Sequence, residues 1–113
     1  MLEYKQPENL PPQKIIDILE TENINDICNA IISIGFYEYE KKWTEDILLK
    51  NNNSDNLDIA SAAITSLGHA IRTHRDIDTK KWLKALDSIP FRLQLQGIIQ
   101  DVIDDISIYA KPQ

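Results

Sequence analysis

The sequence predicts an all-α protein built from three stacked antiparallel helical hairpins. Apolar residues recur at three- and four-residue steps, the spacing of one helix face, along most of the chain. The chain also repeats itself: residues 30–35 (AIISIG) match residues 63–68 (AITSLG) at a separation of 33. In the same way, residues 41–43 (KKW) match residues 80–82 (KKW) at a separation of 39. Repeats of this length correspond to pairs of helices that stack on one another.

The first hairpin is expected at about residues 12–36. Pro12 suits the first turn of a helix, because proline lacks the backbone N–H that this turn leaves unpaired. Asn23 is the expected N-cap of the second helix, Asp26 complements the helix dipole in its first turn, and Gly35 is a natural stop.

The second hairpin is expected at about residues 40–74. Its first helix is predicted over residues 39–50, and Ser54 or Asp55 is expected to cap the second, which runs from residue 57 to about 74. Apolar residues cover a broad stripe of this longer helix, as in a helix with neighbours on two sides. We therefore expect it to be the central element.

The third hairpin is expected at about residues 79–110. Asp76, Asp78 or Thr79 is expected to cap its first helix, and Pro90 is expected to open the second. The apolar positions of the last helix share one face and its aspartates lie largely off that face, which predicts a terminal helix with one side in water.

Length and composition predict a single helical-repeat domain over residues 1–113, with a polar tail at residues 1–10. The 18 acidic and 12 basic residues give a formal net charge of -6. Because such a surface repels phosphates and anionic lipid, nucleic acid and membranes are not expected partners, whereas a basic protein is. The lone Cys28, the lack of a signal-like leader and the lack of a long apolar segment predict a cytoplasmic protein.

Catalytic and metal-binding motifs are not found in the sequence. His69 and His74 are five residues apart, which places them about 140° apart around a helix, so they do not face one metal ion. Cys28 lies among apolar residues, where a thiol is inert. We therefore expect no enzymatic activity, no catalytic residue, no metal and no cofactor.

Residues 56–68 (NLDIASAAITSLG) resemble the second helix of a HEAT repeat. That family has an acidic residue, then Val-Arg, then small residues and a Leu-Gly pair. Ile59 stands here in place of the Val, and Ala60 replaces the usual Arg. The resemblance implies a short HEAT-like α-solenoid.

At the level of the whole chain, a short, acidic, Asn- and Ile-rich, helical protein is similar to the immunity proteins of bacterial contact-dependent growth inhibition systems. Each of those proteins is a small cytoplasmic chain that binds one toxin domain, commonly a nuclease, and blocks it. The resemblance implies this function for the chain and transfers no residue role.

Acidic groups next to tyrosines are the predicted partner-binding residues. A tyrosine ring supplies rigid apolar area at an interface, while neighbouring carboxylates select a basic partner. One such group lies at a hairpin junction and the other on the exposed side of the last helix. The predicted binding residues are Tyr37, Glu38, Tyr39, Glu40, Asp101, Asp104 and Asp105.

Two other features each leave a choice open. A polar stripe along the central helix is either a contact ridge or plain solvated surface; it comprises Asp58, Ser61, Thr65, His69 and Arg72. The acidic faces themselves either bind a partner or only keep the protein soluble. Trp43 and Trp82, at matched repeat positions, are expected to anchor the core between hairpins.

Together these observations predict an immunity protein that neutralises a cognate bacterial toxin by covering its active site, with a basic nuclease as the expected target. The alternative is a non-catalytic helical-repeat adaptor that holds two partners in a larger assembly. A solenoid offers an extended side surface rather than a deep pocket, and both hypotheses use it in this way.

Overall fold

Six α-helices form the part of the chain that the computed structural model describes, residues 8–74, 77–90 and 93–109, and this part contains no strand. The expected residues 1–7 of the tail, the cap candidate Asp76 and the expected hairpin end at residue 110 lie outside the described residues. The helices are α1 (Pro12–Leu19), α2 (Ile24–Phe36), α3 (Lys41–Asn51), α4 (Leu57–Thr73), α5 (Thr79–Asp87) and α6 (Gln96–Tyr109).

Two of the predicted N-caps are confirmed. The Asn23 side chain accepts a hydrogen bond of 3.0 Å from the backbone N–H of Asp26 at the start of α2. The Asp78 side chain accepts one of 3.1 Å from the backbone N–H of Lys81 at the start of α5. Each bond satisfies an amide that the first turn of a helix leaves without an intrahelical partner.

The predicted cap of α4 is wrong by one or two residues. Asn56, rather than Ser54 or Asp55, caps this helix, because its carboxamide oxygen accepts the backbone N–H of Asp58 at 2.9 Å. The Ser54 hydroxyl instead accepts the backbone N–H of Asn56 at 3.1 Å, which holds the preceding turn. An N-cap directly precedes the first helical residue, and that residue is Leu57.

The predicted start of the last helix at Pro90 is also wrong. Helix α6 begins at Gln96, and residues 93–95 form a turn. The first helical hydrogen bond runs from the Ile99 N–H to the Leu95 carbonyl at 2.9 Å. Leu95 is buried at the end of this turn, so the chain first places that side chain in the core and then enters the helix.

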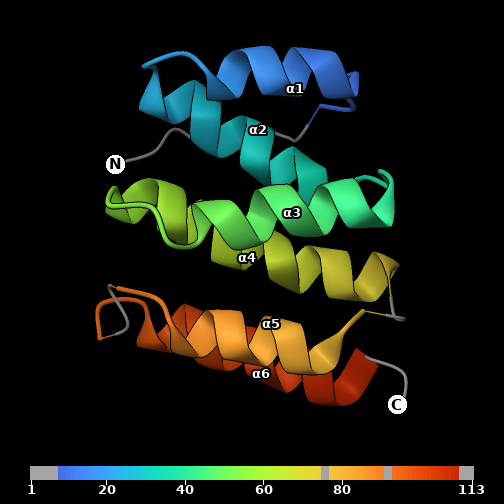
Figure 1. Cartoon of the computed structure of the whole chain (residues 1–113), viewed down its shortest axis with the longest axis vertical. Helices are drawn as coiled ribbons and strands as arrows, with labels where there is room; N and C mark the ends of the chain where they lie inside the picture. Colours follow the sequence, from blue (N-terminus) through green and yellow to red (C-terminus); the bar gives the residue numbers. More distant parts are fainter. Residues whose placement is uncertain (1–7, 75–76, 91–92, 110–113) are drawn as a thin grey trace.

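The helices form two layers (Figure 1). Helix α4 packs between α2 and α6, while α1 packs on α2, α3 on α4 and α5 on α6. In Figure 1, α3 lies in front of α4 and α5 in front of α6. Helix α4 contacts α2, α3 and α6 and holds nine buried residues, which confirms the central position predicted from its broad apolar stripe.

Helices α2 and α4 approach closely where the repeated sequence places small residues. The Ser66 hydroxyl accepts the backbone N–H of Gly35 at 2.8 Å and donates to the Ile31 carbonyl at 2.7 Å. A Cβ atom on Gly35 would overlap the Ser66 carbonyl oxygen and hydroxyl. The two helices therefore pack backbone to backbone at this crossing.

Trp82 anchors the core between two hairpins, as predicted. Its side chain is buried, and its indole N–H donates a 2.6 Å hydrogen bond to the carboxylate of Glu45, which is buried as well. This bond joins α5 to α3. Trp43 anchors the core only in part, because it is half-buried and packs on the Tyr39 ring with 5.2 Å between ring centroids.

Candidate functional site

The two layers carry opposite charge. The three helices α2, α4 and α6 hold five carboxylates and a single Lys or Arg, whereas α1, α3 and α5 hold seven lysines and four carboxylates. The carboxylates of the first layer are Asp26, Asp58, Asp101, Asp104 and Asp105. This distribution gives the side of the molecule formed by α2, α4 and α6 a negative potential, which attracts positively charged groups.

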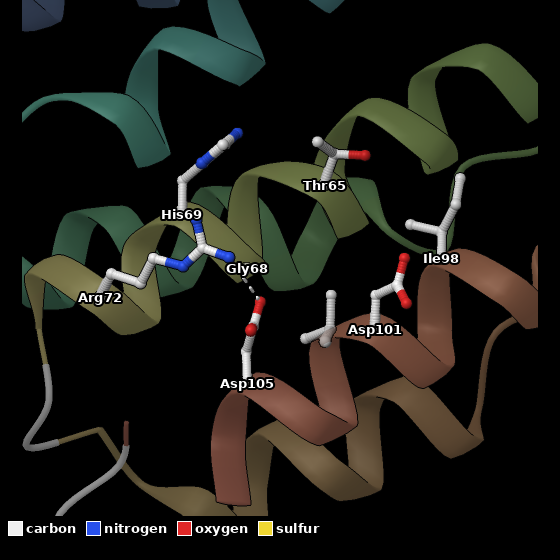
Figure 2. Close-up of a pocket in the computed structure, with 8 residues that line it drawn as sticks. Thr65, Gly68, His69, Arg72, Ile98, Asp101 and Asp105 are labelled. Carbon is white, nitrogen blue, oxygen red and sulfur yellow. Dashed lines mark ion pairs between the residues drawn. The ribbon is translucent and has the colours of Figure 1, made fainter. Parts of the chain in front are cut away.

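A shallow groove of about 190 Å³ opens on this acidic layer between α4 and α6 (Figure 2). Figure 2 shows side chains of both helices around it. Gly68 and Val102 lie at the contact of the two helices, and a Cβ atom on Gly68 would be 3.5 Å from the Val102 side chain. The groove is lined by Thr65, Gly68, His69, Arg72, Ile98, Asp101, Val102 and Asp105.

One end of the groove holds an ion pair. The Arg72 guanidinium lies 3.5 Å from the Asp105 carboxylate and 5.5 Å from the centroid of the Tyr109 ring. Figure 2 shows the Arg72 and Asp105 side chains pointing toward one another from α4 and α6. Asp105 is the more buried partner, because its side chain is 17% exposed against 53% for Arg72. Within the described residues, Asp101 has no ion pair.

Aromatic side chains continue from the groove across α4 to the end of α2. We call His69, Phe36 and Tyr37 the aromatic edge of the groove. His69 is half-buried, and its ring lies edge-on to Phe36 with 6.1 Å between centroids. Phe36 is 49% exposed and also contacts the ring of Tyr37 at 5.1 Å. Burial and then the nearby Arg72 charge lower the pKa of His69 below its ordinary value, while the Asp105 charge opposes this shift.

The predicted residues at the hairpin junction divide into two kinds. Tyr37 is part of the aromatic edge of the groove, and Glu38 is exposed. Tyr39 and Glu40 instead hold the fold: the Tyr39 hydroxyl donates to the Leu10 carbonyl at 2.6 Å, and burial raises the pKa of Tyr39.

Glu40 is the N-cap of α3. Its carboxylate accepts the backbone N–H groups of Trp43 at 2.7 Å and Lys42 at 3.0 Å. These two bonds, that from Trp43 first, lower the pKa of Glu40. If the Glu40 carboxylate turned toward a partner, the first turn of α3 would lose these two capping hydrogen bonds.

The predicted aspartate cluster of α6 is split by the fold. Asp101 and Asp105, four residues apart, line the groove together with three of the five residues of the predicted polar stripe of α4. Asp104 is exposed outside the groove, where its carboxylate accepts a 3.0 Å hydrogen bond from the Gln100 side chain. Two of the three predicted aspartates therefore share one site.

Phe36 was not predicted as a site residue. Its signal in the sequence is weak, because a phenylalanine at the end of an apolar helix is usually taken as core. The sequence feature that could have identified Phe36 is its position directly before the stretch of tyrosines and glutamates at residues 37–40.

The described part of the chain gives little support to metal binding, thiol chemistry or membrane insertion. No group of three His, Cys, Asp or Glu side chains there could hold a metal ion. Cys28 is buried, and burial together with the Asp58 charge raises the pKa of Cys28 to about 11. Among the described helices, none has the length and apolar character that a bilayer-spanning segment requires.

These features define an all-helical protein whose most distinctive site is an acidic groove with an aromatic edge. Among solved structures, the chain is similar to one described as "Crystal structure of CDI complex from Cupriavidus taiwanensis LMG 19424". The TM-score is 0.84 at 26% sequence identity, and the match covers 98% of this chain and 100% of that chain. No protein-family model and no curated protein matches, so the resemblance to HEAT repeats stays a prediction.

Proposed function

We propose that this protein is an immunity protein that binds and neutralises the toxin domain of a contact-dependent growth inhibition system. The observation that carries the proposal is the end-to-end similarity to a chain of the Cupriavidus CDI complex. The TM-score of 0.84 extends over 98% of this chain and 100% of that chain, so the similarity is one of the whole described fold rather than of a single pair of helices. The same class was expected from the composition of the sequence.

The surface supports the same role. Inhibitors of nucleases act on sites that are built to hold phosphate, and such sites are basic. The acidic layer of α2, α4 and α6 offers the complementary charge, with five carboxylates and a single Lys or Arg. We propose that this layer covers the toxin's active site in the cytoplasm and that inhibition is steric and electrostatic, without catalysis by this chain.

Co-expression tests this function directly. A candidate toxin domain, sought first in the reading frames next to this gene, is expressed in a sensitive bacterial host, alone and together with this protein. We expect growth arrest in the first case and growth in the second, along with a stable complex of the two purified proteins. An unrelated acidic helical protein of similar size is the control for non-specific charge effects. Growth arrest that persists with abundant folded protein would refute the proposal and favour the adaptor.

We predict that salt weakens the complex. Electrostatic steering accelerates association, and screening at high ionic strength removes much of that acceleration. Raising NaCl from about 50 mM to about 500 mM is expected to increase Kd about tenfold or more, mainly through a slower association rate. Surface plasmon resonance at several salt concentrations measures both rates. A Kd that stays constant over this range would contradict acidic recognition of a basic toxin.

A further inference from the structure

We propose that the groove between α4 and α6 receives an arginine or lysine side chain of the toxin domain. This inference rests on the proposed function and adds to it the place on the surface where the partner's charge is bound. The occupant is identified by three features of the groove: its carboxylates, its apolar lining and the cation that the chain itself already places at one end.

Asp101 and Asp105 give the groove its charge. They lie four residues apart on α6 and so project from the same side of the helix into the same hollow. Asp105 has a 17% exposed side chain, so a cation that reaches it is partly withdrawn from water. An ion pair that is partly shielded from solvent contributes more to binding than one at an exposed rim.

The lining of the groove suits the stem of a long basic side chain. Ile98 and Val102 supply apolar side chains, and Gly68 supplies none. A Cβ atom at Gly68 would lie 3.2 Å from the Asp105 carboxylate, so the glycine leaves this carboxylate room against α4. Lysine and arginine bury methylene stems against apolar surface while their charged ends bind carboxylates.

Arg72, a residue of this chain, shows that the groove can hold a guanidinium group. Its guanidinium lies between the Asp105 carboxylate and the Tyr109 ring. The separation of 3.5 Å from Asp105 is longer than the roughly 2.8 Å of a strong charge-assisted hydrogen bond. Asp105 therefore keeps acceptor capacity for a second cation, and Asp101 has no cation within the described residues.

The aromatic edge gives the partner a place to pack around the bound charge. Phe36, at 49% exposure, lies against His69, which lines the groove. Apolar groups around a central charged contact exclude water from it, which is the arrangement found at binding hot spots. Burial lowers the pKa of His69, which favours the uncharged ring next to an incoming cation.

Paired variants with the same change in charge test the inference. The groove variant carries Asp101→Asn and Asp105→Asn. The matched control carries Asp17→Asn and Glu22→Gln, two exposed carboxylates that lie outside the layer of α2, α4 and α6 and do not line the groove. We expect the groove variant to raise Kd for the purified toxin domain about 30-fold and the control to raise it less than about threefold. Isothermal titration calorimetry measures both, and thermal melts confirm that each variant is folded.

A third variant blocks the groove while keeping both carboxylates. Thr65→Arg adds a cationic side chain to the α4 side of the groove, and it is expected to weaken toxin binding about tenfold. If wild type binds the toxin and the groove variant binds as well as the control, the groove inference is overturned and the proposed function stands. If wild type neither binds nor protects cells, the proposed function itself fails.

Discussion

Replacing Gly35 by alanine is expected to lower the free energy of unfolding by about 2–3 kcal/mol. Alanine normally stabilises a helix relative to glycine by about 1 kcal/mol. At this position, however, the new methyl group would overlap the Ser66 carbonyl oxygen and hydroxyl and lie 2.8 Å from the Ser66 carbonyl carbon. Backbone atoms cannot rotate away as a side chain can, so α2 and α4 would have to separate.

Gly97→Ala provides the matched control for this prediction. Gly97 is also helical, but a Cβ atom there would have no neighbour within 4 Å. We expect this variant to gain about 0.5 kcal/mol, because the alanine reduces the conformational freedom of the unfolded chain. Urea denaturation followed by far-UV circular dichroism measures both changes. Equal stability of the two variants would mean that the close crossing of α2 and α4 is absent in solution.

The close crossing illustrates what the sequence could and could not predict. The matched segments at residues 30–35 and 63–68 indicated that the two helices play equivalent roles. They did not indicate that Ser66 of one helix would meet Gly35 of the other, 31 residues earlier. A repeat defines equivalent positions in successive units, whereas the contact between units depends on how far one helix slides along its neighbour.

The candidate site was also predicted only in part: the sequence assigned its residues to helix faces but did not bring those faces together. Helical spacing placed Asp101 and Asp105 off the apolar face, and it placed Thr65, His69 and Arg72 on one stripe of α4. Those two predictions became one site only when the fold brought α4 and α6 together. Periodicity assigns a residue to a face of its own helix, but it does not say which other helix that face meets.

Local competition for backbone hydrogen bonds explains the capping role of Glu40, which the sequence did not predict. Its neighbours suggested an interface, but the residue directly before a helix is also the one best placed to accept free backbone N–H groups. The start of α3 was predicted one or two residues too early, at 39–50 instead of Lys41–Asn51. That small error in the boundary hid the capping position.

Replacing Trp82 by alanine is expected to cost about 3–5 kcal/mol, the largest effect of any single substitution considered for this protein. The indole side chain is 1% exposed and fills the core between α3 and α5. Its removal leaves a large cavity and also leaves the buried Glu45 carboxylate without its 2.6 Å hydrogen bond. For a domain of this length such a loss is a large fraction of the total stability.

Two further variants separate the cavity from the hydrogen bond. Trp82→Phe keeps most of the apolar volume but removes the N–H donor, so we expect a cost of about 1–3 kcal/mol from the unsatisfied Glu45 carboxylate. Adding Glu45→Leu to Trp82→Phe removes that unsatisfied acceptor. The double variant should therefore be at least about 1 kcal/mol more stable than the two single costs together imply. Strict additivity in urea denaturation would show that the two side chains are not coupled and that Glu45 meets water instead. Helix α5 contacts α6, so this pair is also connected through the core to the helix that carries Asp101 and Asp105.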